Sequence, residues 1–370
     1  MLEKILSLPL EQKIGQLFFI GLAGAAFDDA ARALLEEVSP AGVCLFARNI
    51  REAAQTRKLL DDVRANSIIE PFLSLDQEGG LVDRLRRVVE PMPAANLLET
   101  PAQAAALARI TAEIVRILGF NMNFAPVVDV VTGARAKFSN GGLFSRAFGK
   151  SKEEVFEFAR AYLDAMQAAG VLGSLKHFPG LGAAEIDSHE ELPHVNLKTE
   201  EFNATDLYPY EEFFRRDEIH AVMIAHAAFP FLDLQETDQS GKLLPSSLSF
   251  NVTSKLLRNQ LGFQGIALTD DLEMGAILKN YGIGEACKMA IMAGQDQLLI
   301  CNDAGNIREG FHAVLEAVKT GELSESRIDN SLQRIAAVKN LMQPPLDFDK
   351  NRLDALSNEI SALKAQKINE

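Results

Sequence analysis

Eight short apolar runs recur along the chain, and most are separated by segments with helical spacing. The runs cover residues 16–24, 41–47, 71–79, 121–130, 171–178, 220–229, 263–271 and 295–301. They are almost continuously apolar, as in strands buried on both faces of a parallel sheet. The clearest helical segments are 28–38, 51–64, 101–118, 151–169 and 249–261, which are rich in alanine, leucine and glutamate. The chain therefore alternates strand and helix over most of its length.

This alternation predicts a single (β/α)8 barrel of the α/β class, because eight such repeats can close a parallel sheet on itself. An open, doubly wound sheet is the alternative. That fold usually has a glycine-rich turn after its first strand, but the segment 21–26 has the wrong glycine spacing, and 180–185 lacks the third glycine. The pattern favours the barrel, over residues 1–342. After a Pro-Pro break we expect residues 343–370 to form a helical tail that is too short for a second domain.

The 370 residues carry a formal net charge of −14, and no basic cluster reverses it locally. Such a surface repels phosphate backbones and anionic lipid, so neither nucleic acid nor membrane is expected as a partner. Charged residues interrupt the apolar start of the chain, which does not read as a signal peptide. The three cysteines, Cys44, Cys287 and Cys301, form no CxxC pair. A reducing cytoplasm is the expected location.

Ionisable residues lie at the ends of five consecutive predicted strands, from the third to the seventh. They are Asp76 and Glu78, Asp129, Lys176 and His177, His226, and Asp270 and Asp271. In a barrel these ends meet at one mouth, where active sites are built. A charge that closes an apolar run costs free energy unless it is paired or used. One such case is usually structural, but five together predict a site.

The Asp270–Asp271 pair offers two different roles. Asp is a preferred helix N-cap, and Asp271 is expected to cap a helix that begins at Leu272. Asp270 is then the last strand residue and points into the mouth. A carboxylate held there can attack an anomeric carbon or stabilise an oxocarbenium-like transition state.

A second candidate is the triplet Asp187-Ser188-His189 in the long loop after the fifth run. A loop histidine beside an aspartate is often only a surface turn. Here, however, Asp187 could bond one ring nitrogen of His189 and leave the other to exchange protons near neutral pH. Neither a metal nor a cofactor is expected, because the chain has no HExxH, P-loop or GxSxG motif.

Six phrases carry a resemblance to a known family. They are LDQEGGLVDRL, NFAPVVD, SRAFG, KHFPGLG followed by DSH, VMIAH, and SLSFNVTSKLLRNQLGFQGIALTDDLEMGAI. In this order they resemble glycoside hydrolase family 3, and more narrowly its bacterial β-N-acetylglucosaminidase branch. The resemblance covers nearly all of residues 8–342.

The resemblance implies roles for individual residues. Asp270 matches the family's nucleophile, and His189, supported by Asp187, matches the general acid/base of this branch. The implied contacts to sugar hydroxyls are Asp76, Arg84, Arg146, Lys176 and His177. Lys176 and His177 would face opposite ways in a regular strand, so both can reach a ligand only if the strand has frayed.

The implied activity is retaining removal of non-reducing terminal N-acetylglucosamine from a saccharide that contains it. A muropeptide fragment in peptidoglycan recycling is the substrate that the resemblance suggests. A family 3 β-glucosidase or β-xylosidase is the nearest alternative, although these usually take their acid from a second domain. A substrate-assisted hexosaminidase and a non-catalytic sugar-binding barrel are the others. Leu81, Ser145 and the pair Ala183-Ala184 depart from the family pattern, and the pair lies in the catalytic loop.

Overall fold

The computed structural model describes residues 1–131, 142–184, 191–216 and 219–365. Nine parallel strands form the central sheet, in the order β7-β6-β3-β2-β1-β11-β10-β9-β8. In chain order they are β1 (Phe18–Gly21), β2 (Gly42–Leu45), β3 (Phe72–Leu75), β6 (Met122–Asn123), β7 (Leu172–Gly173), β8 (Leu175–Phe178), β9 (Ala221–Ile224), β10 (Ile266–Asp271) and β11 (Gln297–Ile300).

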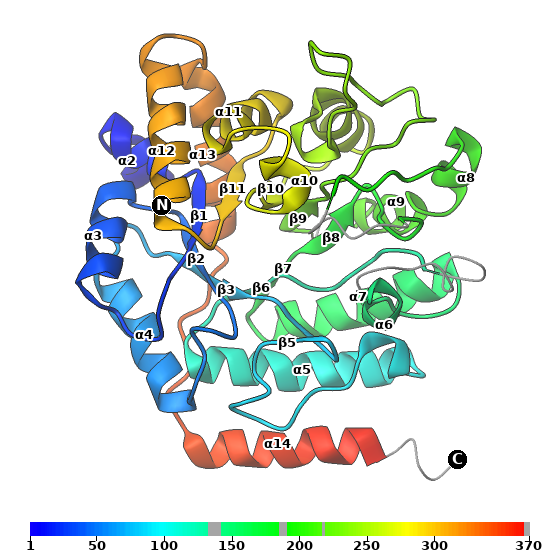
Figure 1. Ribbon diagram of the computed structural model, residues 1–370. Helices are drawn as coiled ribbons and strands as arrows, with labels where there is room; N and C mark the ends of the chain where they lie inside the picture. Colours follow the sequence, from blue (N-terminus) through cyan, green and yellow to red (C-terminus); the bar gives the residue numbers. More distant parts are fainter. Residues whose placement is uncertain (132–141, 185–190, 217–218, 366–370) are drawn as a thin grey trace.

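The sheet closes on itself at its fifth strand. Its two end members, β7 and β8, are consecutive in the chain and separated only by Ser174. Strand β7 pairs with β6, and strand β8 pairs with β9. Counted as one strand, they make a closed eight-stranded barrel with helices around it (Figure 1). The predicted (β/α)8 barrel is therefore confirmed, and each of the eight apolar runs contains a strand.

Helices cover the outside of the barrel. The longer ones are α3 (Asp29–Val38), α4 (Ala53–Ala65), α5 (Pro101–Leu118), α7 (Lys152–Ala168), the π-helix η4 (Asn251–Gln260), α11 (Ile283–Ala293), α12 (Ala304–Lys319), α13 (Glu325–Lys339) and α14 (Lys350–Ala365). The shorter ones are α1 (Leu2–Leu6), α2 (Leu10–Gly15), η1 (Ala95–Leu97), α6 (Leu143–Arg146), α8 (Thr199–Ala204), α9 (Tyr208–Phe214), η3 (Ser246–Leu248) and α10 (Gly275–Leu278).

Local signals explain where the best-predicted helix begins and ends. The Thr100 hydroxyl accepts the N–H of Gln103, and Pro101 occupies the first turn of α5, where its missing N–H costs nothing. At the other end, Gly119 has φ of 102°, a left-handed conformation that favours glycine. The apolar side of this helix is buried against its neighbours, chiefly α7.

The last helix, α14, lies along α5 on the outside of the barrel (Figure 1). Leu353, Leu356 and Ile360 are fully buried in this contact. The domain boundary at residue 342 stays a prediction. No helix in the described ranges combines the length and the hydropathy needed to cross a membrane.

Candidate active site

A cavity of about 420 Å³ opens where the strands end. Six of the eight predicted site residues line it: Asp76, Arg84, Arg146, Lys176, His177 and Asp270. They come from segments far apart in the sequence, as expected for a barrel mouth. The other two, Asp187 and His189, lie outside the described residues.

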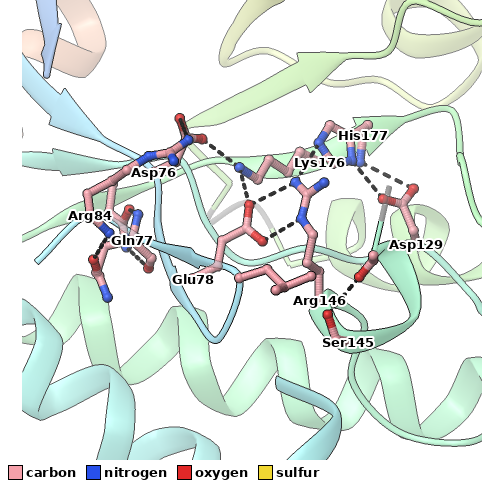
Figure 2. Close-up of polar contacts among 12 residues, drawn as sticks. Asp76, Gln77, Glu78, Arg84, Asp129, Ser145, Arg146, Lys176 and His177 are labelled. Carbon is pink, nitrogen blue, oxygen red and sulfur yellow. Dashed lines mark hydrogen bonds and ion pairs between the residues drawn. The ribbon is translucent and has the colours of Figure 1, made fainter. Parts of the chain in front are cut away.

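A network of ion pairs lies along one side of this cavity (Figure 2). The Lys176 Nζ lies 2.7 Å from Asp76 Oδ1 and 2.6 Å from Glu78 Oε1. The Arg146 guanidinium binds Glu78 through two hydrogen bonds, of 2.8 and 2.9 Å. Glu78 therefore pairs with two cations at once, and it holds both in fixed positions on the cavity wall.

The charged groups of this network shift one another's pKa values. Burial opposes the ionisation of Glu78, but Arg146 and Lys176 outweigh it and hold the Glu78 pKa far below its usual range. Burial likewise opposes the charged form of Lys176, and Asp76 with Glu78 raises the Lys176 pKa in spite of it. Glu78, Arg146 and Lys176 therefore stay charged across the pH range in which enzymes work.

His177 extends this network from Arg146 to Asp129. Its Nδ1 lies 2.7 Å from Asp129 Oδ2, and its Nε2 lies 3.3 Å from Arg146 Nη2 (Figure 2). An ionised carboxylate only accepts and a guanidinium only donates, so His177 carries its proton on Nδ1 and accepts at Nε2. The other Asp129 oxygen accepts the Leu181 N–H at 2.7 Å. Asp129 thus fixes both the imidazole and the start of the following loop.

Lys176 and His177 both line the cavity although they are neighbours on β8. The pairing of β8 with β9 shifts register between Leu175 and Phe178. This irregularity departs from the strict alternation of a regular strand. The prediction that the strand frays before these residues is wrong, because β8 continues to Phe178.

Asp270 lies near the end of β10, and one of its oxygens accepts the N–H of Asp271 at 2.8 Å. Burial would raise the Asp270 pKa, but it is outweighed by the positive charges of His177 and His226 in their protonated forms, by the Asp271 N–H and by Lys176, which lower that pKa. A carboxylate that is ionised, partly desolvated and held on a strand is suited to nucleophilic attack.

Asp271 is not the helix cap that the sequence suggested. Helix α10 begins only at Gly275, and its N-cap is Met274. Asp271 instead accepts the Glu273 N–H at 3.0 Å, which closes a tight turn after the strand. Burial, together with the charges of Glu273 and Asp270, raises the Asp271 pKa to about 7.

We expect Asp271→Asn to change how the free energy of unfolding depends on pH between about pH 4 and 8. In this interval folded Asp271 keeps a proton that the unfolded chain has already released, because its pKa rises from 3.8 to about 7 on folding. Ionising it costs stability, so the wild type should lose stability relative to the variant as the pH rises. Asparagine keeps an acceptor for the Glu273 N–H. Thermal unfolding of both proteins across this range measures the difference, and parallel curves would contradict the assignment.

His226 contacts the turn that follows Asp270. Its Nδ1 lies 2.7 Å from the Ser247 hydroxyl, and its Nε2 lies 3.0 Å from the carbonyl oxygen of Asp271. A carbonyl only accepts, so Nε2 carries the proton and donates it. The sequence singled out this histidine without a role, and the structure places it in contact with the residue after Asp270.

The sequence analysis missed three polar residues of the cavity, Arg48, Glu273 and Asn302. Arg48 follows the second apolar run and Asn302 follows the eighth, so the rule used for the other strand ends could have found both. Glu273 accepts the Asp303 N–H at 3.0 Å and the Asn306 side chain at 2.7 Å, which fixes the loop after β11. Its partners are distant in sequence and gave no local signal.

Three comparisons place the chain among known proteins. The β-hexosaminidase A of Pseudoalteromonas piscicida is 32% identical over 327 residues, which cover 83% of this chain and 54% of that protein. This chain thus spans about half the length of that relative. The β-hexosaminidase of Tolumonas auensis is 31% identical over 313 residues, covering 83% and 88%. A solved glycoside hydrolase family 3 β-N-acetylglucosaminidase from Paenibacillus sp. is 34% identical with a TM-score of 0.83, covering 96% and 69%.

These similarities agree with the barrel and with the cavity at its mouth. The sequence profile of the glycosyl hydrolase family 3 N-terminal domain matches residues 9–338. That match covers most of the chain, including every cavity residue named above. The chain belongs to glycosyl hydrolase family 3.

Proposed function

We propose that this chain is a retaining β-N-acetylhexosaminidase that removes non-reducing terminal N-acetylglucosamine from a glycan. The observation that carries the proposal is Asp270, a carboxylate with a lowered pKa that lines the cavity together with Lys176 and His177. The printed names of the relatives, β-hexosaminidase and β-N-acetylglucosaminidase, supply the sugar.

The proposed mechanism has two steps. In the first, an Asp270 oxygen attacks the anomeric carbon, the glycosidic C–O bond breaks, and His189 gives its proton to the leaving oxygen. In the second, His189 takes a proton from water, the water oxygen attacks the same carbon, and the bond to Asp270 breaks. Two inversions retain the β configuration. Asp187 would orient His189 and hold it in the tautomer that this task needs.

Sugar binding is assigned to the charged residues along the wall. Asp76, Arg84, Arg146 and Lys176 offer charged acceptors and donors to hydroxyl groups, and His177 adds an imidazole. Because Glu78 and Asp129 already fix Arg146, Lys176 and His177, substrate binding orders few side chains. A muropeptide fragment is the natural substrate proposed here, in peptidoglycan recycling in the cytoplasm.

A different acid is favoured by one observation. Asp271 lines the same cavity, and its pKa of about 7 leaves it largely protonated in weak acid. It could therefore donate the proton that the mechanism assigns to His189. Comparing His189→Ala with Asp271→Asn decides between them: the true acid's variant should lose about 100-fold or more in kcat and regain much of it on substrates with good leaving groups.

The activity itself is tested with paired chromogenic substrates. We expect the 4-nitrophenyl β-N-acetylglucosaminide to be cleaved with a kcat/KM at least about 100-fold above that of the β-glucoside. Proton NMR of the first product should show the β-anomer before mutarotation. Preference for the glucoside would move the chain to a glucosidase activity. An α-anomer as first product would refute the retaining mechanism, and binding without cleavage would favour the non-catalytic barrel.

A further inference from the structure

Two guanidinium groups lie over one aromatic ring on the cavity wall. The Cζ atoms of Arg48 and Arg84 are 4.9 and 5.5 Å from the ring centroid of Phe46. All three residues line the cavity. Phe46 and Arg48 follow β2, and Arg84 follows the short strand β5 (Val82–Asp83). Two like charges are thus held close together against an apolar surface, which screens them less than water would.

Among the described residues, Arg48 has no carboxylate partner, and Arg84 has only one long ion pair. Arg48 donates to the carbonyl oxygens of Leu22 and Cys301, which are neutral. The nearest carboxylate oxygen to Arg84 belongs to Asp76, at 3.8 Å, and Asp76 already binds Lys176. The buried Arg84 Nε has no hydrogen-bond partner in the described structure.

The other two cations of the cavity have close carboxylate partners. Arg146 and Lys176 each have a carboxylate oxygen within 2.8 Å. Across the part of the chain that the structure describes, no carboxylate lies within 4.0 Å of Arg48. Cations out of bulk water are normally paired. Two adjacent cations that share only the long Arg84–Asp76 ion pair, in a binding cavity, therefore point to an anionic group on the ligand.

The position of this pair relative to Asp270 indicates which end of a sugar it meets. In the barrel order, β3 is four strands from β10, so Arg84, which lies beside Asp76 at the end of β3, is across the cavity from the nucleophile. Arg48 reaches from the end of β2 to Cys301 after β11, between Arg84 and the nucleophile's strand. The wall near β10 is acidic, with Asp270, Asp271 and Glu273. If the anomeric carbon of a pyranose lies at Asp270, its far side, with C4 and the C6 arm carried on C5, faces Arg84 and the neighbouring Arg48.

We propose that Arg48 and Arg84, over Phe46, form a subsite for a sulfate or phosphate ester at C6 of the terminal N-acetylglucosamine. The planar forks of two arginines match the oxygens of such a group. This subsite rests on the proposed function for the orientation of the sugar. It extends that function from a neutral sugar to sugars with an anionic ester.

A purely structural role for Arg48 is the competing explanation, because its two carbonyl contacts tie the loop after β1 to the end of β11. The two explanations differ in selectivity. Loosening these loops should slow neutral and anionic substrates alike, whereas loss of a subsite should affect only the anionic ones. The ratio of two kcat/KM values is therefore the measurement to make.

The substrates are 4-nitrophenyl β-N-acetylglucosaminide and its 6-O-sulfate, tested on the wild type, Arg48→Gln and Arg48→Lys. Arg51→Gln is the matched control, because Arg51 is exposed and does not line the cavity. We expect the wild type to prefer the sulfated substrate, and Arg48→Gln to lower the sulfated-to-neutral ratio about tenfold. Arg48→Lys should keep part of the ratio, and Arg51→Gln all of it. Added NaCl should lower the wild-type ratio, a result that needs no variant to fold.

Calorimetry on the wild type with N-acetylglucosamine, its 6-sulfate and its 6-phosphate separates this proposal from the proposed function. Tighter binding of either ester, lost in Arg48→Gln, supports the subsite even if no substrate is cleaved, and the tighter ester identifies the group. Cleavage of the neutral substrate with rejection of both esters would overturn the subsite and leave the glycosidase intact. A ratio that Arg48→Gln leaves unchanged would also overturn it.

Discussion

Asp270→Asn is expected to lower kcat on the 4-nitrophenyl β-N-acetylglucosaminide by about four orders of magnitude, since removing a nucleophile abolishes the covalent route. Asparagine has the same shape and can still accept the Asp271 N–H that Asp270 accepts at 2.8 Å. The fold should therefore persist. Steady-state kinetics measure the loss, and circular dichroism with calorimetric binding of N-acetylglucosamine checks that the cavity is intact.

The control for this variant is Asp29→Asn, which removes a carboxylate from the exposed first turn of α3. It should retain wild-type kinetics. A stronger test traps the intermediate with a 2-deoxy-2-fluoro glycoside and locates the sugar by peptide mass analysis. A sugar attached to any residue other than Asp270, or an Asp270→Asn variant with more than about a tenth of wild-type kcat, would show that the nucleophile lies elsewhere.

The barrel could be predicted from the sequence because each strand is buried on both faces. Such strands leave short, nearly continuous apolar runs, and the regular alternation of these runs with helical segments identifies them as strands. The short hairpin of β4 (Gln77–Gly79) and β5 could not be predicted in this way. It is held by polar side chains, for example Gln77 donating to Asp83 at 2.9 Å, and such pairs leave no periodic signal.

The site divides along the same line. Asp76 and Asp270 were found because they end apolar runs, and both line the cavity. What they bind could not be predicted, because the pairing of Asp76 with Lys176 joins residues 100 positions apart. Arg48 follows a strand as Asp76 does. The same rule could have found it, but its contacts to Leu22 and Cys301, which lie far away in the sequence, could not be predicted.

Glu78→Gln is expected to cause the largest loss of stability of any single change to the cavity wall. Glu78 is almost fully buried and binds Arg146 and Lys176 at 2.6–2.9 Å. Glutamine has nearly the same volume, but it leaves Lys176 with Asp76 alone and Arg146 without a carboxylate partner among the described residues. Breaking a buried ion pair from one side typically costs about 3–5 kcal/mol. The free energy of unfolding from urea titration measures this cost, and kcat/KM should fall as well, because both proposed sugar contacts lose their support.

Glu113→Gln is the matched control for this change. Glu113 forms the same two-pronged pair with Arg352, at 2.6 and 2.7 Å, but on the surface between α5 and α14. An exposed pair contributes about 1 kcal/mol or less. The pH dependence separates the two further. Because the folded pKa of Glu78 is depressed, its contribution is fully present above the unfolded value of 4.5 and is lost as the pH falls through the folded value. The gap between wild type and Glu78→Gln should thus be constant from pH 8 to about 5 and shrink in stronger acid. Equal losses in the two variants would mean that burial adds nothing to the pair on the cavity wall.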